Sequence, residues 1–191
     1  FYLMLFYLTV GNTLLLLFNK LRSDEIKIYN ISFSLGIFFL FISFFFLIFF
    51  NDDSQYDNDA LNFFNLSTNF KEFDLLTLRI FTEGSIAVVI WRYIYEFFHF
   101  FGFQKGFYVG IFFNIFLFSI SSIFILKISK LVNKMNEIKI NNLIFYYSFS
   151  GLLLLFATSH VRDIFIFFFF NLMIYLFLII RKKRNIFFIP F

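Results

Sequence analysis

A run of twenty uncharged, mostly apolar residues from Ile31 to Phe50 constrains this chain more than any other feature of its sequence. An α-helix needs about 20 such residues to cross the roughly 30 Å hydrocarbon core of a bilayer. The composition agrees, because 61% of the 191 residues are hydrophobic, more than a soluble domain of this size can bury. The sequence therefore predicts an all-α polytopic membrane protein.

Four further segments are similarly apolar, and we expect about five transmembrane helices in a single integral membrane domain, residues 1–191. The expected spans are residues 1–18, 31–50, 107–126, 143–159 and 164–180. Because the chain begins without Met and stops just after a basic run, we expect it to be a fragment of a longer protein. Cysteine is absent, which excludes disulfides, thiolate metal sites and cysteine nucleophiles.

Residues 85–103 are long and apolar enough to cross a membrane, yet they contain Arg92, Glu96 and His99. The spacing of these three residues places them on one face of a helix. The other face carries Ile86, Ile90, Tyr93 and Phe97. Such a pattern is typical of an amphipathic helix that lies in the membrane interface, so we expect a surface helix here.

The distribution of basic residues supports this interpretation. If residues 85–103 do not cross, residues 19–30, residues 127–142 and the tail Arg181–Arg184 share one side of the membrane. These segments hold three, four and four of the 16 Lys and Arg residues. The positive-inside rule places that side in the cytoplasm and makes residues 51–84 an outward loop.

The outward loop begins with a dense group of carboxylates. Four acids lie within eight residues, namely Asp52, Asp53, Asp57 and Asp59. Carboxylates gathered on a membrane face can bind a divalent cation, or one of them can act as a general base. A solvated acidic loop without a function is the alternative.

The short turn from His160 to Asp163 is expected on the same outward face as the acidic loop. Arg162 and Asp163 lie there between two apolar spans with almost no connecting loop, where charge is costly and often functional. Arginine on this face could hold a phosphate group through two parallel hydrogen bonds. A salt-bridged turn between helices is the alternative.

Motifs of soluble enzymes are absent from the sequence. It contains no GxGxxG, GxxxxGK[ST], GxSxG or HExxH motif, and its two histidines argue against a multi-histidine metal site. We expect no required cofactor, although the acidic loop could bind a divalent cation, and we expect no nucleic-acid partner.

Several short motifs follow one another in a distinctive order. They are Asp53-Ser54-Gln55-Tyr56-Asp57, Glu83-Gly84, the aromatic run from Tyr93 to Gly102, and Arg162-Asp163. In this order the chain resembles the first half of bacterial Wzy-type (EpsG-like) polysaccharide polymerases and of GT-C glycosyltransferases. The resemblance implies transfer or polymerisation of polyprenyl-phosphate-linked glycans during assembly of surface polysaccharide.

The resemblance also implies roles for individual residues. Asp53 or Asp57 would be the general base or a cation ligand, Tyr56 a sugar contact and Arg162 a phosphate contact. The wider set of substrate-binding candidates is Tyr56, Glu83, Arg92, His160, Arg162 and Asp163. The implied partners are membrane lipid, a polyprenyl-phosphate-linked sugar and other polysaccharide-assembly membrane proteins, with the site on the outer face of the bacterial inner membrane.

Two other classes of protein remain open at the level of sequence. An AT-rich organellar genome also encodes Phe-rich chains, so a non-catalytic membrane subunit of an organellar respiratory complex is the main alternative. Part of a transporter is the other. A transporter would carry ionisable residues in the middle of its spans, and the five expected spans carry none there.

Overall fold

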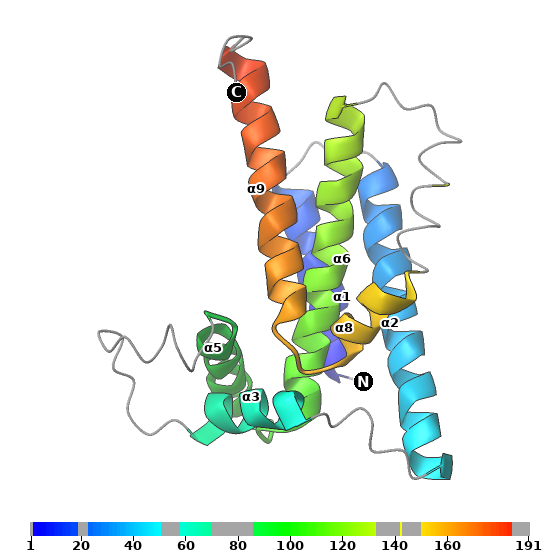
Figure 1. The fold of residues 1–191 in the computed structure, drawn as a ribbon, viewed down its shortest axis with the longest axis vertical. Coiled ribbons are helices and arrows are strands. Elements are labelled where there is room, and N and C mark those ends of the chain that lie inside the picture. The colour runs from blue at the N-terminus through cyan, green and yellow to red at the C-terminus, as the bar shows by residue number, and fades with distance from the viewer. Residues whose placement is uncertain are drawn as a thin grey trace.

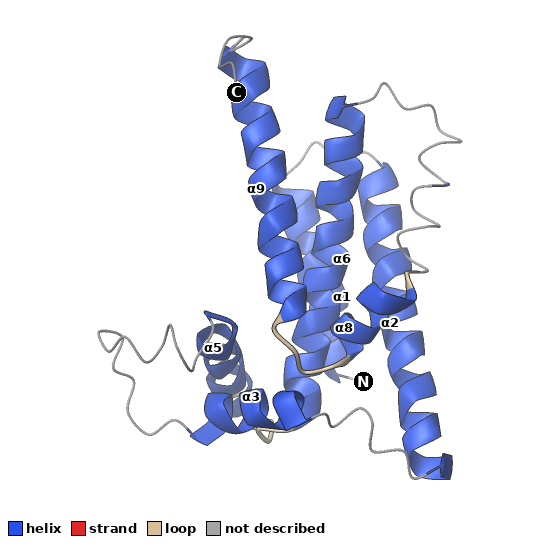
Figure 2. Cartoon of the chain, in the orientation of Figure 1, coloured by secondary structure: helices blue, strands red, loops and turns tan. Residues whose placement is uncertain are grey.

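The computed structural model describes residues 2–18, 23–50, 58–69, 86–132, 142 and 150–184. Within these ranges the chain forms helices joined by short loops, with no strand, as Figure 2 shows. The helices are α1 (Tyr2–Phe18), α2 (Ser23–Phe50), α3 (Asn58–Asn69), α5 (Ile86–Phe100), α6 (Phe107–Val132), α8 (Gly151–Thr158) and α9 (Asp163–Arg184). The predicted all-α class is confirmed for the described residues.

Three helices among the described residues are long and apolar enough to cross a membrane. They are Asp24–Phe45 within α2, the whole of α6, and Asp163–Arg181 within α9. These helices correspond to the second, third and fifth expected spans and are compatible with an integral membrane protein.

The expected number of about five spans is not confirmed. The first expected span forms α1, a helix of 17 residues that is not among the three candidate spans. Of the fourth, residues 143–149 lie outside the described residues, and most of the rest forms α8. At 1.5 Å per residue, the eight residues of α8 extend about 12 Å, which is too short to cross a bilayer alone.

Helix α6 is the central helix of the bundle. It contacts α1, α2, α5, α8 and α9, and Figure 1 shows it running between α9 and α2. In its most apolar stretch 67% of the residues are buried, against 17% in α9. Ser119 and Ser121 of α6 donate hydrogen bonds to the backbone carbonyls of Ile115 and Leu117 in the same helix. Their hydroxyls are therefore satisfied within α6, and their small side chains allow close packing of neighbouring helices.

Polar contacts between α1 and α2 hold the first two helices together. The Tyr29 hydroxyl donates a hydrogen bond of 2.7 Å to the Tyr7 carbonyl, and the Asn12 amide donates one of 3.2 Å to Asn30 Oδ1. Hydrogen bonds between apolar helices fix their rotation where a hydrophobic contact alone would allow sliding.

Ion pairs join α2 and α6 at one end of the bundle. Lys130 Nζ lies 2.8 Å from Asp24 Oδ2, and Lys127 Nζ lies 3.6 Å from Glu25 Oε2. Helix α9 also ends at this end, as Figure 1 shows. The helix ends that adjoin the three basic segments of the sequence therefore lie together.

At the opposite end, α3 and α5 lie across the bundle axis beside the start of α6 and α9 (Figure 1). Helix α5 falls in the segment predicted to be a surface helix, but it has a third face that the sequence interpretation missed. Its buried residues are Ala87, Val88, Trp91, Tyr95 and Phe98. Tyr93 and Phe97 are exposed, and so are Glu96 and His99. Of the expected apolar face only Ile90 packs against the core, so the main packed face is one that the sequence did not predict.

Candidate functional site

His160 occupies the centre of the end where α3, α5 and the α8–α9 turn meet. Its side chain is fully buried in that turn. The imidazole stacks on the indole of Trp91, with ring centroids 3.9 Å apart and an interplanar angle of 28°. The ring of Phe64 from α3 approaches the imidazole edge-on at 6.0 Å. Helices α3 and α5 thus enclose one titratable side chain of the α8–α9 turn.

Hydrogen bonds connect α5 and α6 with the α8–α9 turn through Trp91, Tyr95 and Asn114. The Tyr95 hydroxyl lies 2.8 Å from His160 Nε2. The Trp91 indole N–H donates to Asn114 Oδ1 at 3.0 Å, and the Asn114 amide donates to the Ser159 carbonyl at 2.8 Å. This network joins α5 and α6 to the α8–α9 turn. We call Trp91, Tyr95, Asn114 and His160 the histidine cluster.

Gly110 gives the histidine cluster room in the first turns of α6. A Cβ atom at this position would overlap the His160 ring and the Tyr95 hydroxyl. The Gly110 backbone adjoins the Tyr95 hydroxyl in the first turns of α6, and this contact lowers the pKa of Tyr95.

Burial keeps the histidine cluster neutral. It lowers the pKa of His160 to about 3, and a weaker effect of its own backbone opposes this shift. Burial also raises the pKa of Tyr95, an effect that the Gly110 hydrogen bond partly offsets. Nδ1, the other ring nitrogen of His160, is a buried atom with no hydrogen-bond partner among the described residues. In this conformation His160 contacts a substrate only if the cluster opens, so its geometry suits positioning rather than acid–base chemistry.

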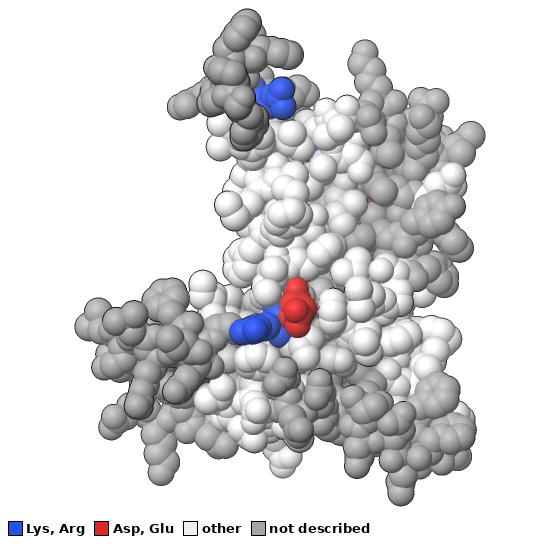
Figure 3. Space-filling model, in the orientation of Figure 1, with Lys and Arg blue, Asp and Glu red and all other residues white. Residues whose placement is uncertain are grey.

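Arg162 and Asp163 are exposed at the start of α9. The Arg162 guanidinium carbon lies 5.7 Å from the centroid of the Phe63 ring on α3, within cation–π range. Asp163 lies in the first turn of α9, where the helix dipole favours a negative charge. Figure 3 shows acidic and basic side chains adjoining at this end of the visible face. Two charged groups are therefore available to a ligand beside the buried histidine cluster.

The remaining candidates from the sequence divide into two groups. Arg92 is half-buried on α5, next to the exposed pair that Glu96 forms with Lys105. The other candidates lie outside the described residues, namely Asp52, Asp53, Tyr56, Asp57 and Glu83. Asp59 belongs to the first turn of α3, and only its backbone is described.

The contact of Arg162 with Phe63 bears on how close Arg162 lies to the acidic loop. Helix α3 begins at Asn58, directly after the acidic stretch, and five residues of helix separate Asn58 from Phe63 by about 8 Å. Arg162 therefore lies near the point where the acidic stretch enters α3. The distance from Arg162 to the loop carboxylates themselves falls outside the described residues.

Within the described part of the chain, no group of three or more His, Asp or Glu side chains could hold a metal ion. The predicted cation ligands Asp52, Asp53 and Asp57 are not in that part, and the side chain of Asp59 is not described. The divalent-cation site consequently stays a prediction from the sequence.

Sequence reasoning missed Trp91, Tyr95 and Asn114. Two signals pointed to them: Trp91 is the single tryptophan of the chain, and Asn114 is a polar residue inside an apolar span. Neither signal indicates His160, because the hydrogen bond between Tyr95 and His160 bridges 65 residues of sequence.

Comparison of the chain with models of protein families, with curated proteins and with solved structures finds no match. The resemblance to polysaccharide polymerases and GT-C glycosyltransferases therefore stays a prediction from short motifs.

Proposed function

We propose that this protein acts in the transfer or polymerisation of polyprenyl-phosphate-linked glycans. The observation that carries the proposal is the contact of Arg162 with Phe63, which brings an exposed guanidinium to the helix that follows the acidic stretch. Glycosyl transfer from a lipid phosphate requires a cation that binds the phosphate and a carboxylate that accepts the proton of the acceptor hydroxyl.

In the proposed reaction, Arg162 holds the phosphate of the lipid-linked donor through its planar fork of N–H groups. An acceptor hydroxyl attacks the anomeric carbon, and Asp53 or Asp57 takes the hydroxyl proton. The new C–O bond forms as the bond between the anomeric carbon and the phosphate oxygen breaks, and the polyprenyl phosphate or pyrophosphate leaves with the electron pair. Configuration at the anomeric carbon is inverted.

The histidine cluster has a positioning role in this proposal. It ties α5 and α6 to the α8–α9 turn and so fixes Arg162 at the end of the bundle. Side chains locked by packing and hydrogen bonds hold a neighbouring charged group in place better than a free loop does.

Replacing both Asp53 and Asp57 with Asn tests the proposal. The double variant keeps side-chain size and loses two charges, and loss of a general base costs about 10²- to 10⁴-fold in rate. The full-length gene is expressed in the source strain lacking its own copy, and polymer length is scored on a gel. Asp74→Asn, the same change elsewhere in the outward loop, is the matched control.

We expect the double variant to reach the membrane in normal amount and to make no polymer, while the control makes polymer of normal length. Normal polymer from the double variant would refute a chemical role for the loop. It would favour the alternative of a non-catalytic membrane subunit, for which exposed loop substitutions cost little.

A further inference from the structure

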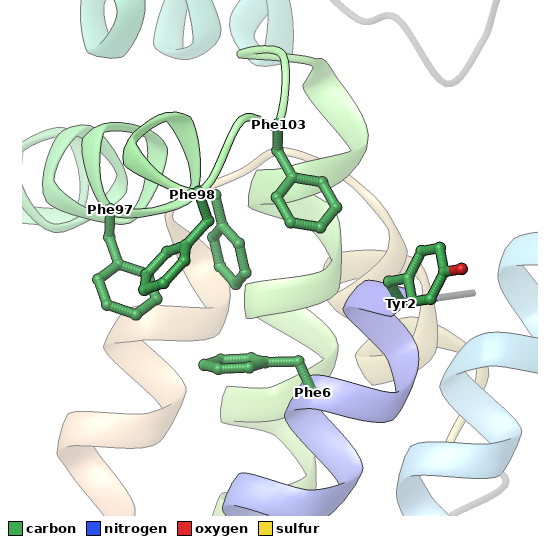
Figure 4. A pocket seen from close by; sticks show the side chains of 6 residues that line it. Tyr2, Phe6, Phe97, Phe98 and Phe103 are labelled. Atoms are coloured by element: carbon green, nitrogen blue, oxygen red, sulfur yellow. The ribbon is translucent and has the colours of Figure 1, made fainter.

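An aromatic pocket of about 330 Å³ lies where the N-terminal end of α1 meets the end of α5 and the loop leading into α6. Its lining residues are Tyr2, Phe6, Phe97, Phe98, Phe101 and Phe103. Figure 4 shows the rings of Phe6, Phe97, Phe98 and Phe103 turned toward a common space, with Tyr2 at its edge. The volume is at the lower end of the range typical of small-molecule sites.

Ring contacts define the walls of the aromatic pocket. Phe6 and Phe98 meet edge to face at a centroid distance of 5.2 Å, which joins α1 to α5. Phe97 and Phe101 are 5.1 Å apart, and Phe98 and Phe103 are 5.7 Å apart. The Tyr2 hydroxyl is the only polar side-chain atom among the six lining residues. Walls of this kind select a hydrocarbon, because they offer almost no group that could orient a polar ligand.

The surface beside the aromatic pocket is also apolar. Large exposed side chains continue from it along α5, with Tyr93 at 62% and Phe100 at 86% exposure, and along α1 at Leu5. Each square ångström of such surface costs about 25 cal/mol in contact with water. Three helices of the same bundle are long and apolar enough to cross a membrane, so a bilayer would surround this bundle with hydrocarbon. A pocket that opens to that hydrocarbon could take up an acyl chain without the chain crossing water.

An ion pair lies next to the aromatic pocket in the sequence, because Glu96 precedes the lining residue Phe97 on α5 and Lys105 lies two residues after Phe103 in the loop into α6. Lys105 donates a hydrogen bond to Glu96, and both side chains are partly exposed. That hydrogen bond is the largest cause that lowers the pKa of Glu96, so the carboxylate stays charged. The Lys105 ammonium has further N–H donors for a phosphate, and the second Glu96 oxygen can accept from an ammonium. A zwitterionic headgroup matches this arrangement of one cation beside one anion.

We propose that the aromatic pocket binds an acyl chain of a bilayer phospholipid with a zwitterionic headgroup, of the phosphatidylethanolamine type, and that the headgroup meets the Glu96–Lys105 pair. Because the walls have few polar groups, they discriminate little between hydrocarbon ligands, and the most abundant ligand occupies the pocket. In a membrane the most abundant hydrocarbon is the acyl chains of the bilayer lipids. The bound lipid fills the space between α1 and α5 and so supports α5 across the end of the bundle. This site is separate from the proposed glycan chemistry and does not depend on it.

Tryptophan substituted at either of two neighbouring phenylalanine positions gives a matched pair of fluorescence reporters for the test. Phe101 lines the pocket and is 61% exposed, whereas Phe100 is 86% exposed and does not line it. Phe101→Trp and Phe100→Trp are made in the full-length protein, where buried Trp91 gives the same background in both. The purified proteins in detergent are titrated with phosphatidylethanolamine carrying bromine on its acyl chains, which quenches tryptophan fluorescence on contact.

We expect half-maximal quenching of the Phe101→Trp reporter at about tenfold lower lipid fraction than that of Phe100→Trp. Adding Lys105→Gln leaves the pocket walls intact, and should raise the lipid fraction needed by the Phe101→Trp reporter about three- to fivefold, the range for an exposed charge contact. The Phe100→Trp reporter should not respond to Lys105→Gln. Mass spectrometry of the unsubstituted protein should detect the lipid carried through purification, independently of any reporter.

Four outcomes would overturn the proposal. Identical quenching curves for the two reporters would mean that the pocket does not bind lipid in preference to its surroundings. An unquenched Phe101→Trp reporter would mean that a protein segment fills the pocket. Equal or stronger binding of brominated phosphatidylglycerol would refute the zwitterionic headgroup, and displacement by polyprenyl phosphate but not by unlabelled phosphatidylethanolamine would assign the pocket to the glycan carrier.

Discussion

The hydroxyl of Tyr95 lies 2.8 Å from Nε2 of His160, and this contact joins the helix across the bundle end to the turn from which α9 begins. The two residues are far apart in the sequence, and both side chains are almost completely buried. Their contact makes the position of Arg162 and Asp163 dependent on the packing of α5. Three of the predictions below follow from it.

Tyr95→Phe removes the hydroxyl and leaves His160 Nε2 buried without its hydrogen-bond partner. A buried polar atom that loses its partner costs about 1–3 kcal/mol, so we expect a loss of stability of that size. Thermal unfolding in detergent, followed by Trp91 fluorescence, measures it. Tyr93→Phe on the exposed side of the same helix should change stability by less than about 0.5 kcal/mol. Equal effects of the two substitutions would contradict the assigned contact.

Gly110→Ala should destabilise the protein, because the added methyl group overlaps His160 and the Tyr95 hydroxyl. Overpacking of a tight interior typically costs about 1–3 kcal/mol. Gly151→Ala is the matched control: no atom lies within 4 Å of a Cβ built there, and alanine in a helix is favoured by up to about 1 kcal/mol over glycine. The prediction fails if both alanine variants unfold at the temperature of the unsubstituted protein.

The low pKa of His160 predicts an acid-sensitive fold. In the unfolded chain this histidine has its ordinary pKa of 6.5, whereas in the folded chain burial lowers the pKa to about 3. Between these values the unfolded state binds a proton that the folded state excludes. The stability contribution is therefore complete above pH 6.5 and decreases as the pH falls toward 3, by at most about 1.4 kcal/mol per pH unit.

The measurement compares the pH dependence of unfolding in the unsubstituted protein and in His160→Phe. All other ionisable groups are the same in the two proteins, so the difference between the two slopes isolates His160. Between pH 6 and pH 4 we expect the free energy of unfolding to depend less steeply on pH in His160→Phe, since about one fewer proton is taken up on unfolding. This expectation holds whether or not the substitution changes the overall stability. Parallel slopes would show that His160 is not held neutral by burial.

Arg162→Lys should reduce glycan transfer by roughly tenfold or more, because an ammonium cannot reproduce a bidentate grip on phosphate and a charged hydrogen bond contributes about 1.5–3 kcal/mol. Polymer made in the complementation assay is the readout. Arg181→Lys, the same change in the last part of α9, should have no effect. Full polymer from Arg162→Lys would remove this residue from the proposed mechanism.

The ion pairs that join α2 to α6 predict a common side for the basic segments. Single cysteines at Ser129 and Asn185 should react with an impermeant thiol reagent only from the cytoplasmic side, and a cysteine at His99 only from the outside. The sequence contains no native cysteine, so labelling has no background. Labelling of Ser129 and Asn185 from outside would reverse the proposed orientation.

The sequence by itself determined which segments form long apolar helices. Uncharged runs in α2, α6 and α9 are local properties of composition, and each matches the length that a bilayer requires. The sequence also placed Arg162 and Asp163 at the beginning of a helix, since they directly precede an apolar run. None of these features depends on which segments pack together.

Only the tertiary structure decided which face of α5 is buried and what His160 contacts. Forty phenylalanines leave apolar residues on every side of a helix, so periodicity could not separate the packed stripe of Trp91, Tyr95 and Phe98 from the exposed stripe of Tyr93 and Phe97. The fourth expected span was likewise apolar enough to cross, yet its described part forms the short helix α8 against α6. Burial and pairing at these positions depend on neighbours that are distant in the sequence, so the pattern along one segment cannot predict them.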